Sequence, residues 1–153
     1  MCTPMIICVP VNLKQLFKRQ RNYPWPPRPE VCPRCRLGGL WGHGFALAYF
    51  DGLPAGVFLR RYRCPHCGCV IRLRPKGFFR RFQASITTIR ASLLCRVTAG
   101  HCLPGISTNR QRHWLSGLIR NVMAHLGSRW RSRLLEGFDH LAAAGYVPVS
   151  SAV

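Results

Sequence analysis

Two short cysteine motifs constrain the fold of this chain more than any other feature of its sequence. The motif Cys-Pro-Arg-Cys spans residues 32–35, and the motif Cys-Pro-His-Cys spans residues 64–67. Each puts two thiols on a tight turn, and the residues between the motifs are enough for a β-hairpin that returns the second pair to the first. A tetrahedral zinc ion takes four thiolates in this way, at about 2.3 Å from each sulfur. The predicted ligands of one structural zinc ion are Cys32, Cys35, Cys64 and Cys67.

The residue that follows the motif differs between the two copies. Gly68 follows the second motif and is free to take the positive φ that such a turn needs, whereas Arg36 stands at the matching position of the first. The sequence therefore predicts a weaker first turn. Cys69 lies two residues beyond Cys67 and is an alternative ligand in a shifted register. Four thiolates leave no open coordination position, so we expect a structural ion rather than a catalytic one.

Two other uses of paired cysteines fit the pattern less well. Iron in a rubredoxin-like site also takes four cysteines, but a strongly basic surface is unusual for a small electron carrier. A redox-active pair would not explain why a second pair is present. Zinc is therefore the expected metal.

The charge of the chain is strongly positive. Its 153 residues include 23 lysines and arginines against 4 aspartates and glutamates, a formal net charge of +19. Such a field attracts polyanions, of which nucleic acid is the commonest. Lysine occurs only at Lys14, Lys18 and Lys76, and the planar guanidinium group of the many arginines suits both phosphates and guanine edges. We therefore expect a nucleic-acid partner.

Cysteine usage and the start of the chain indicate a reducing compartment. The 9 cysteines cannot all pair in disulfides within one chain. Residues 1–11 are apolar, but they lack a basic leading segment and are interrupted by Pro4 and Pro10, unlike a secretion signal. No apolar run approaches the roughly 20 residues of a membrane span. The expected location is the cytoplasm, in association with the nucleoid and without membrane contact.

The sequence divides into four consecutive segments. Residues 1–30 hold a short strand at residues 5–9, a short basic helix at residues 13–19 capped by Asn12, and a proline-rich linker. Residues 31–77 alternate in the manner of strands and form the predicted zinc ribbon. Residues 78–145 have helical periodicity, and residues 146–153 are expected to be a flexible tail. The predicted fold class is α+β: a small zinc-ribbon β module followed by a three-helix segment that is similar to a helix-turn-helix.

The helical segment favours a helix-turn-helix. A first helix is expected at about residues 83–98, with Gly100 as its C-terminal stop. A second is expected from Ser107 or Thr108, and a third, capped by Ser128, ends near Gly145. The second would be the recognition helix, because residue types that bind base edges or phosphates fill its first turns. These residues are Asn109, Arg110, Arg112 and His113. The loop before it is longer than the usual turn of about three or four residues, so a plain helical hairpin with a solvated basic side is the alternative.

Arginines also alternate with aromatic residues through the strand-like region and just beyond it. Guanidinium groups neutralise phosphates, and exposed rings stack on bases. The arginines predicted to contact nucleic acid are Arg60, Arg61, Arg63, Arg72, Arg74, Arg80 and Arg81. For the neighbouring rings of Phe78, Phe79 and Phe82 we expect packing at the joint between the two halves instead.

Catalysis has little support in the sequence. A two-metal nuclease needs about three carboxylates that converge on one site. The acids of this chain are scattered: Glu30, Asp51, Glu136 and Asp139. A thiol nucleophile at Cys95 or Cys102 beside His101 has no orienting acid near it in sequence. We expect a binding protein without a catalytic site of its own.

A series of motifs follows in order between residues 24 and 126. They are the linker PWPPRP, the first cysteine motif, LWGHG, RRYRCPHCG and GISTNRQRHW. This order resembles the N-terminal part of certain bacterial insertion-sequence transposases, and it is similar to small zinc-ribbon proteins associated with mobile elements. The resemblance implies that the ribbon and the helix-turn-helix bind terminal inverted repeats, while a separate domain with three catalytic acids cuts the DNA.

No such set of acids is present in this sequence, so the resemblance implies recognition without cleavage. The protein would then be an accessory protein, a regulator or a truncated remnant. The predicted function is that of a zinc-stabilised protein whose partner is double-stranded DNA, with a transposase or a second copy of the chain as a further partner. The alternatives are an RNA-binding or ribosome-associated zinc-ribbon protein and a minimal nuclease.

Overall fold

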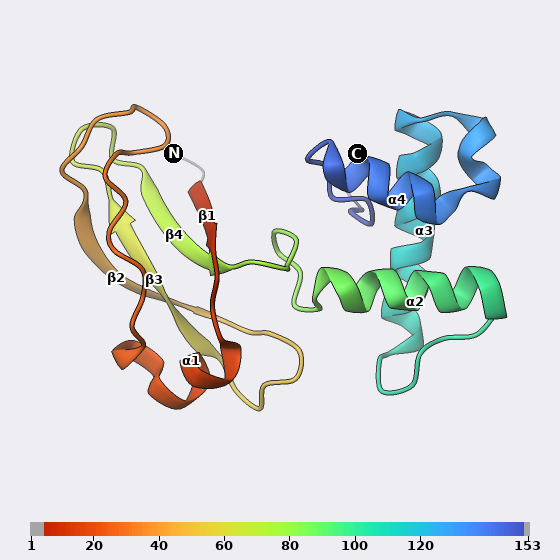
Figure 1. Ribbon diagram of the computed structural model, residues 1–153, viewed down its shortest axis with the longest axis horizontal. Coiled ribbons are helices and arrows are strands. Elements are labelled where there is room, and N and C mark those ends of the chain that lie inside the picture. The colour runs from red at the N-terminus through yellow and green to blue at the C-terminus, as the bar shows by residue number, and fades with distance from the viewer. Residues whose placement is uncertain (1–4, 152–153) are drawn as a thin grey trace. The chain divides into compact units, whose positions relative to one another are not determined.

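The computed structural model describes residues 5–151 and separates the chain into two compact units, Met1–Phe78 and Phe79–Val153. Figure 1 shows that the first unit is built on a β-sheet and that the second is helical. This content of strands and helices confirms the expected α+β class. We call the two parts the sheet unit and the helical unit.

The sheet unit contains a four-stranded mixed sheet. Its strands are β1 (Met5–Val9), β2 (Trp41–Ala48), β3 (Val57–Arg63) and β4 (Val70–Pro75), in the order β1-β4-β3-β2. Strands β2, β3 and β4 are antiparallel neighbours, whereas β1 lies parallel to β4 with Ile6 opposite Arg72. The segment of residues 1–30, which we expected to stand apart from the ribbon, therefore supplies an edge strand of the sheet.

Helix α1 (Leu13–Arg19) and a short 3-10 turn, η1 (Gln20–Asn22), connect β1 to the proline-rich linker. The Asn12 side chain caps α1 by accepting a hydrogen bond from the backbone N–H of Gln15 at 3.1 Å. This cap and both bounds of the helix agree with the sequence prediction, because an asparagine followed by alternating apolar and basic residues is a strong local signal.

Two hydrophobic clusters hold the sheet unit together. One surrounds the cysteine motifs and includes Leu40, Tyr62, Ile71 and Leu73. The other joins α1 to the sheet and includes Leu16, Phe50, Val57 and Leu59. Trp25 contacts both clusters, so the proline-rich linker packs on the sheet unit rather than extending away from it.

The helical unit consists of α2 (Ile86–Ala99), α3 (Thr108–His125) and α4 (Leu134–Ala143), with a 3-10 turn η2 (Ser128–Ser132) before α4. Ser85 caps α2 by accepting from the backbone N–H of Thr88 at 3.2 Å, and Gly100 ends the helix with a φ of 75°. All three helices contribute to one core, whose buried side chains include Ile89, Leu93, Trp114, Leu118, Phe138 and Leu141.

The helical unit differs from the prediction at its connections. Helix α2 starts at Ile86, later than expected, and Ser128 begins a 3-10 turn rather than the third helix, which starts at Leu134. The segment between α2 and α3 runs from Gly100 to Ser107, whereas a helix-turn-helix uses a turn of about three or four residues. The unit is thus a three-helix assembly in which a helix-turn-helix is not established.

The last described residues pack on α3. Val149 is buried, and the Asn121 side-chain amide donates to the carbonyl oxygens of Pro148 at 2.8 Å and Ser150 at 3.0 Å. Gly117 permits this close approach, because a Cβ there would lie 2.5 Å from the Val149 carbonyl oxygen. The expected flexible tail is therefore docked up to residue 151. Its residues 152–153, and residues 1–4 of the expected N-terminal segment, lie outside the described residues.

Candidate metal centre and basic sheet face

The two cysteine motifs form turns with the same backbone hydrogen bonds. In the first turn, the Cys32 N–H donates to the Leu37 carbonyl at 2.8 Å and the Arg36 N–H donates to the Cys32 carbonyl at 2.9 Å. In the second, the Cys64 N–H donates to the Cys69 carbonyl at 2.9 Å, and the Gly68 N–H donates to the Cys64 carbonyl at 3.0 Å. We call these segments, residues 32–37 and 64–69, the first and second cysteine turns.

The arginine in the first turn does not change its backbone geometry. Arg36 has a φ of 67° and Gly68 has a φ of 73°, so both residues occupy the left-handed region at equivalent positions. An arginine pays roughly 1–2 kcal/mol for this conformation, which glycine adopts freely. The first turn is therefore expected to be less stable than the second, although the two have the same backbone conformation.

The turns bring four cysteine sulfurs into one cluster. The Sγ atoms of Cys32, Cys35, Cys64 and Cys67 all lie within 4.8 Å of one another. The Cys32 and Cys67 sulfurs are 3.7 Å apart, and those of Cys35 and Cys64 are 3.5 Å apart. A tetrahedral ion with metal–sulfur bonds of about 2.3 Å has sulfur–sulfur edges of about 3.8 Å. The four cysteines therefore suit a structural metal ion.

The close packing of the four thiols shifts the pKa values of individual cysteines in opposite directions. A hydrogen bond from the Cys67 backbone lowers the pKa of the Cys64 thiol to about 6, against the raising effect of burial. For Cys67 the Cys69 backbone acts in the lowering direction, but burial and the neighbouring sulfurs raise the pKa to about 12. One thiol ionises readily and another resists, because adjacent thiolates repel each other. A bound cation removes this repulsion and favours four thiolates together.

Cys69, the alternative ligand of the sequence analysis, lies outside this cluster. Its thiol is buried and donates to the carbonyl oxygen of Val70 at 3.7 Å. It packs with Leu40 and Ile71 beside the metal cysteines. The role that the structure gives Cys69 is therefore that of a small apolar core residue that joins the second turn to β4.

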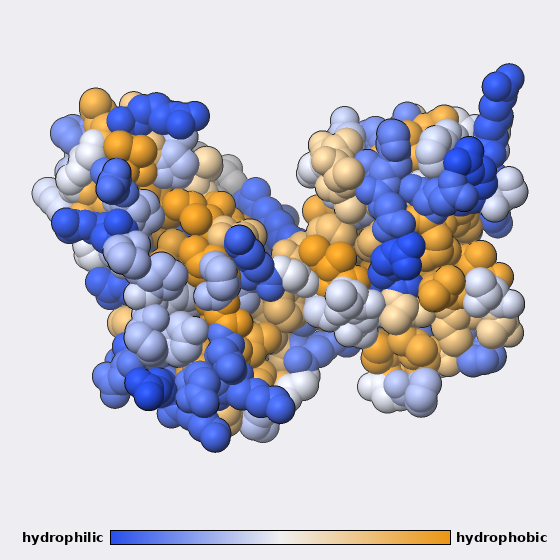
Figure 2. Space-filling model, in the orientation of Figure 1, coloured by the Kyte–Doolittle hydropathy of each residue, from blue (hydrophilic) through white to orange (hydrophobic). Residues whose placement is uncertain are grey.

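A basic face of the sheet begins directly beside the second cysteine turn. Arg61 on β3 lies opposite Arg72 on β4, and Arg63 lies two residues further along the same face of β3. Like charges placed directly opposite each other destabilise a sheet. The Nε atoms of Arg61 and Arg72 are both buried without a hydrogen-bond partner among the described residues. We call Arg61, Arg63 and Arg72 the arginine face. On the side of the molecule that Figure 2 shows, hydrophilic residues cover much of the sheet unit.

Two other predicted arginines of the sheet have packing partners instead. Arg60 lies over the rings of Phe45 at 5.2 Å and Tyr62 at 5.1 Å. Arg74 is only 8% exposed and lies over Phe50 at 5.1 Å, and its burial lowers the pKa of its guanidinium group. Arg74 lies on the same face of β4 as Arg72, but its burial beside Phe50 leaves little of its side chain open to the phosphate contact that the sequence predicted.

Sequence reasoning missed a stacked arginine near these rings. Arg21, in the 3-10 turn η1, lies over the ring of Phe58 at 4.5 Å and over that of Phe45 at 6.0 Å. Cation–π contacts of this kind fix both the cation and the ring. The basic helix α1 gave a hint of positive charge in this region, but the contact depends on the fold that packs η1 near β3.

The predicted contact residues of the helical unit belong to different elements. Arg80 and Arg81 are exposed before α2, and Asn109, Arg112 and His113 are exposed in the first turns of α3. Arg110 lies over the Trp114 ring at 5.2 Å. Gln111 between them is buried, where its side-chain oxygen accepts from Ser92 and from the Leu103 N–H. The start of α3 is therefore exposed, and its contact with nucleic acid stays a prediction.

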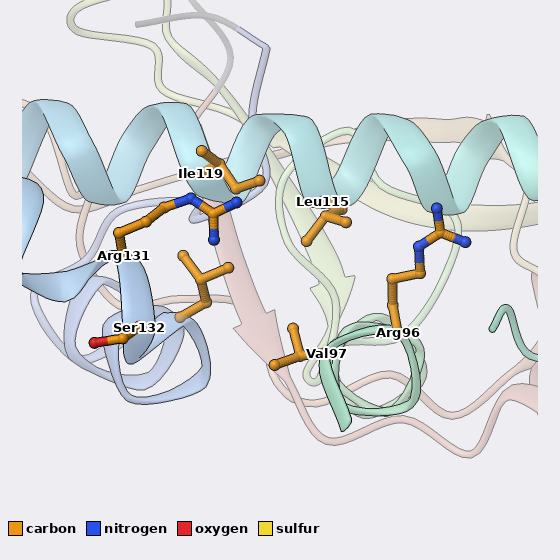
Figure 3. Close-up of a pocket in the computed structure, with 7 residues that line it drawn as sticks. Arg96, Val97, Leu115, Ile119, Arg131 and Ser132 are labelled. Atoms are coloured by element: carbon orange, nitrogen blue, oxygen red, sulfur yellow. The ribbon is translucent and has the colours of Figure 1, made fainter. Parts of the chain in front are cut away.

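An open hollow of about 350 Å³ lies in the helical unit between α2, α3 and η2. Figure 3 shows the apolar side chains of Val97, Leu115 and Ile119 in this hollow, with the guanidinium groups of Arg96 and Arg131 at its two sides. Its lining residues include no carboxylate, histidine or cysteine. The hollow therefore offers no pair of groups for acid–base chemistry.

Two of the four acids are held in ion pairs of the helical unit. Asp139 accepts from Arg90 at two oxygens, each at 2.8 Å, and Glu136 accepts from Arg133. These arginines lower the pKa of both carboxyl groups. Glu30 and Asp51 lie in the other unit. The four acids are therefore divided between the two units.

Comparison with known proteins leaves the chain without a relative that would assign its function. No family model matches it, and no curated protein and no solved structure matches it significantly. Among the described residues, no helix is both long enough and apolar enough to cross a membrane. The function is therefore inferred from the residues of this chain alone.

Proposed function

We propose that this protein binds double-stranded DNA through the arginine face of a sheet that is held in place by a zinc ion. The observation that carries the proposal is the direct pairing of Arg61 with Arg72 beside the cysteine cluster. Two facing guanidinium groups repel each other, and an anion that lies between or above them relieves this repulsion; a phosphate of the DNA backbone would act in this way.

Zinc is the ion we propose for the four cysteines. A set of four thiolates is typical of zinc or iron, and four ligands leave no position for a substrate. The ion would therefore fold the sheet unit rather than act on a substrate. Because Arg63 immediately precedes Cys64, fixing the second cysteine turn also fixes the end of the arginine face.

Two further observations support DNA as the partner. The net charge of +19 supplies a long-range attraction to any polyanion, and the order of motifs, which resembles the DNA-recognition part of insertion-sequence transposases, favours DNA among them. The exposed residues Asn109, Arg112 and His113 of α3 would provide a second contact. We propose recognition without cleavage, in the manner of an accessory protein or a regulator of such an element.

The salt dependence of binding tests this proposal. Binding of the zinc-loaded full chain to a short duplex is measured by fluorescence anisotropy at increasing salt. If about six phosphates are contacted, log K should fall against log salt with a slope near −5. The double variant Arg61→Ala/Arg72→Ala should bind more weakly and reduce the slope by up to about 2.

Arg19→Ala is the matched control, because Arg19 is an exposed arginine at the end of α1 in the same unit. Its slope should change much less than that of the double variant. A flat salt dependence, or equal effects of the control and the double variant, would contradict the proposal. A structured RNA tested at the same salt separates the two nucleic acids, and clearly tighter binding to RNA would overturn the choice of DNA.

A further inference from the structure

Trp41 differs from the other tryptophans of the chain in having an exposed ring without a stacking partner. Trp41 is 62% exposed, and no ring or cation lies over it among the described residues. In contrast, Trp25 packs against Tyr23 with ring centroids 5.2 Å apart, whereas Trp114 and Trp130 each lie under an arginine. An indole ring that is 62% exposed at a fixed position offers a large apolar face to a binding partner.

The position of Trp41 is fixed by the end of the sheet that lies next to the four clustered cysteines. The preceding residue, Leu40, is buried among the cysteines, and its carbonyl oxygen accepts a hydrogen bond from Arg28 at 2.8 Å. Trp41 itself starts β2 and lies opposite Arg63, the residue before Cys64. The backbone on both sides of the ring is therefore held by the cysteine cluster, and stacking on the ring would cost little ordering.

The arginine face continues directly from Trp41. Residues opposite each other in an antiparallel pair share a face, so Trp41 and Arg63 project from the same side of the sheet. Arg61 lies two residues along β3, about 6.6–6.8 Å away, with Arg72 beside it. The ring of Trp41 can stack on a base of a nucleotide strand, and the row of guanidinium groups next to it can bind the phosphates of the same strand.

We propose that Trp41 stacks on an unpaired base while Arg63, Arg61 and Arg72 hold the phosphates that follow it. A base inside a duplex is covered on both faces by its neighbours, so the indole ring is accessible only to a base that has left the stack or that lies beyond the end of the duplex. This inference rests on the proposed DNA-binding function and narrows its target to duplex DNA that ends or opens into a single strand.

Three DNA probes with the same duplex test the inference. The first is blunt, the second carries a short single-stranded thymidine overhang, and the third carries an overhang of equal length that has sugars and phosphates but no bases. The full zinc-loaded chain should prefer the thymidine overhang to the abasic one. Trp41→Ala should weaken binding to the thymidine overhang by about 5- to 150-fold, the range for one stacked base, and should leave the abasic and blunt probes nearly unchanged.

Two further variants separate stacking from other effects. Trp41→Phe should keep much of the preference for the thymidine overhang, since phenylalanine retains a flat ring. Leu37→Ala is the matched control, because Leu37 is an apolar side chain of the first cysteine turn with 50% exposure, and it should have little effect. Zinc content measured on each variant verifies that the fold is retained.

The outcomes distinguish this inference from the function on which it rests. Equal losses of Trp41→Ala on the thymidine and abasic overhangs, or an equal loss in Leu37→Ala, would overturn the stacking role while leaving DNA binding intact. Failure of the unaltered protein to bind any of the three probes would instead overturn the proposed function.

Discussion

The two units of this protein maintain their folds by different means. The helical unit has one core of eleven buried residues, contributed by all three helices and by residues on both sides of them. The sheet unit has two smaller clusters of seven and four buried residues, and cysteines form three of the seven. A small sheet rarely buries enough apolar surface to be stable alone. We therefore predict that the fold of the sheet unit depends on a metal ion and that the fold of the helical unit does not.

The largest effect we predict is the loss of the sheet unit on removal of the metal. Chelation, or the variant Cys64→Ser, should unfold the sheet unit, because apparent zinc binding supplies about 10–16 kcal/mol in small zinc modules. Hydrogen exchange of the full chain should then show loss of protection in β2, β3 and β4 and retained protection in α2, α3 and α4. Unchanged protection of the strands after chelation would refute the claim that the sheet unit needs a metal ion to stay folded.

Shortening a core side chain of the helical unit should destabilise that unit and leave the sheet unit intact. Leu118→Ala removes a fully buried side chain of α3 and should lower the free energy of unfolding of the helical unit by about 2–5 kcal/mol. Zinc content should not change. The control Leu94→Ala alters an exposed leucine of α2 in the same unit, and denaturant unfolding followed by helical circular dichroism should show a change below about 0.5 kcal/mol. A loss of zinc in Leu118→Ala would show that the two units are energetically coupled.

Within the sheet unit, the two cysteine turns allow a finer comparison. Gly68→Ala should destabilise the metal-loaded protein by roughly 1–2 kcal/mol through its positive φ alone, since the nearest atom to a new Cβ is an arginine nitrogen at 4.0 Å. Arg36→Gly should have the reverse sign, with a gain of up to about 1 kcal/mol. Competition with a zinc chelator measures both changes. Effects of the same sign would mean that the turns are not equivalent.

The smallest effect we predict concerns the ion pair between α2 and α4. Arg90 donates to both oxygens of Asp139 and holds the pKa of that carboxyl below its ordinary value of 3.8. A lowered folded pKa means that the pair adds stability above about pH 4 and that this contribution is lost as the pH falls further. Because the pair is half exposed, Asp139→Asn should cost at most about 1 kcal/mol at neutral pH. Urea unfolding should show a smaller difference in acid, and a constant difference would assign the effect to another cause.

The features that the sequence predicted well are those encoded within a few residues. The cap of α1 at Asn12, the bounds of β1 and the end of α2 at Gly100 each follow from a local signal. The four cysteines of the cluster were also predicted, because their spacing on tight turns restricts how they can meet. Zinc as the ion and DNA as the partner remain proposals.

The features that the sequence did not predict depend on contacts between distant residues. Nothing in residues 5–9 indicates that they pair in parallel with β4. The burial of Arg74, on the same face of β4 as the half-buried Arg72, depends on its contact with Phe50, which is distant in sequence. The docking of residues 146–151 depends on Gly117, which looks like a weak point of a helix until its contact with Val149 is known.

The parallel pairing of β1 with β4 affects how the protein is made. Strand β1 is synthesised before the other three strands of this sheet, and it pairs with the last of them, since Ile6 lies opposite Arg72. Until β4 has been synthesised, the apolar residues of β1 have no partner and can associate with other nascent chains. The second cysteine turn leads directly into β4, so we expect metal capture and closure of the sheet to occur at the same stage of translation. The supply of metal during synthesis would then set how much of the protein escapes aggregation.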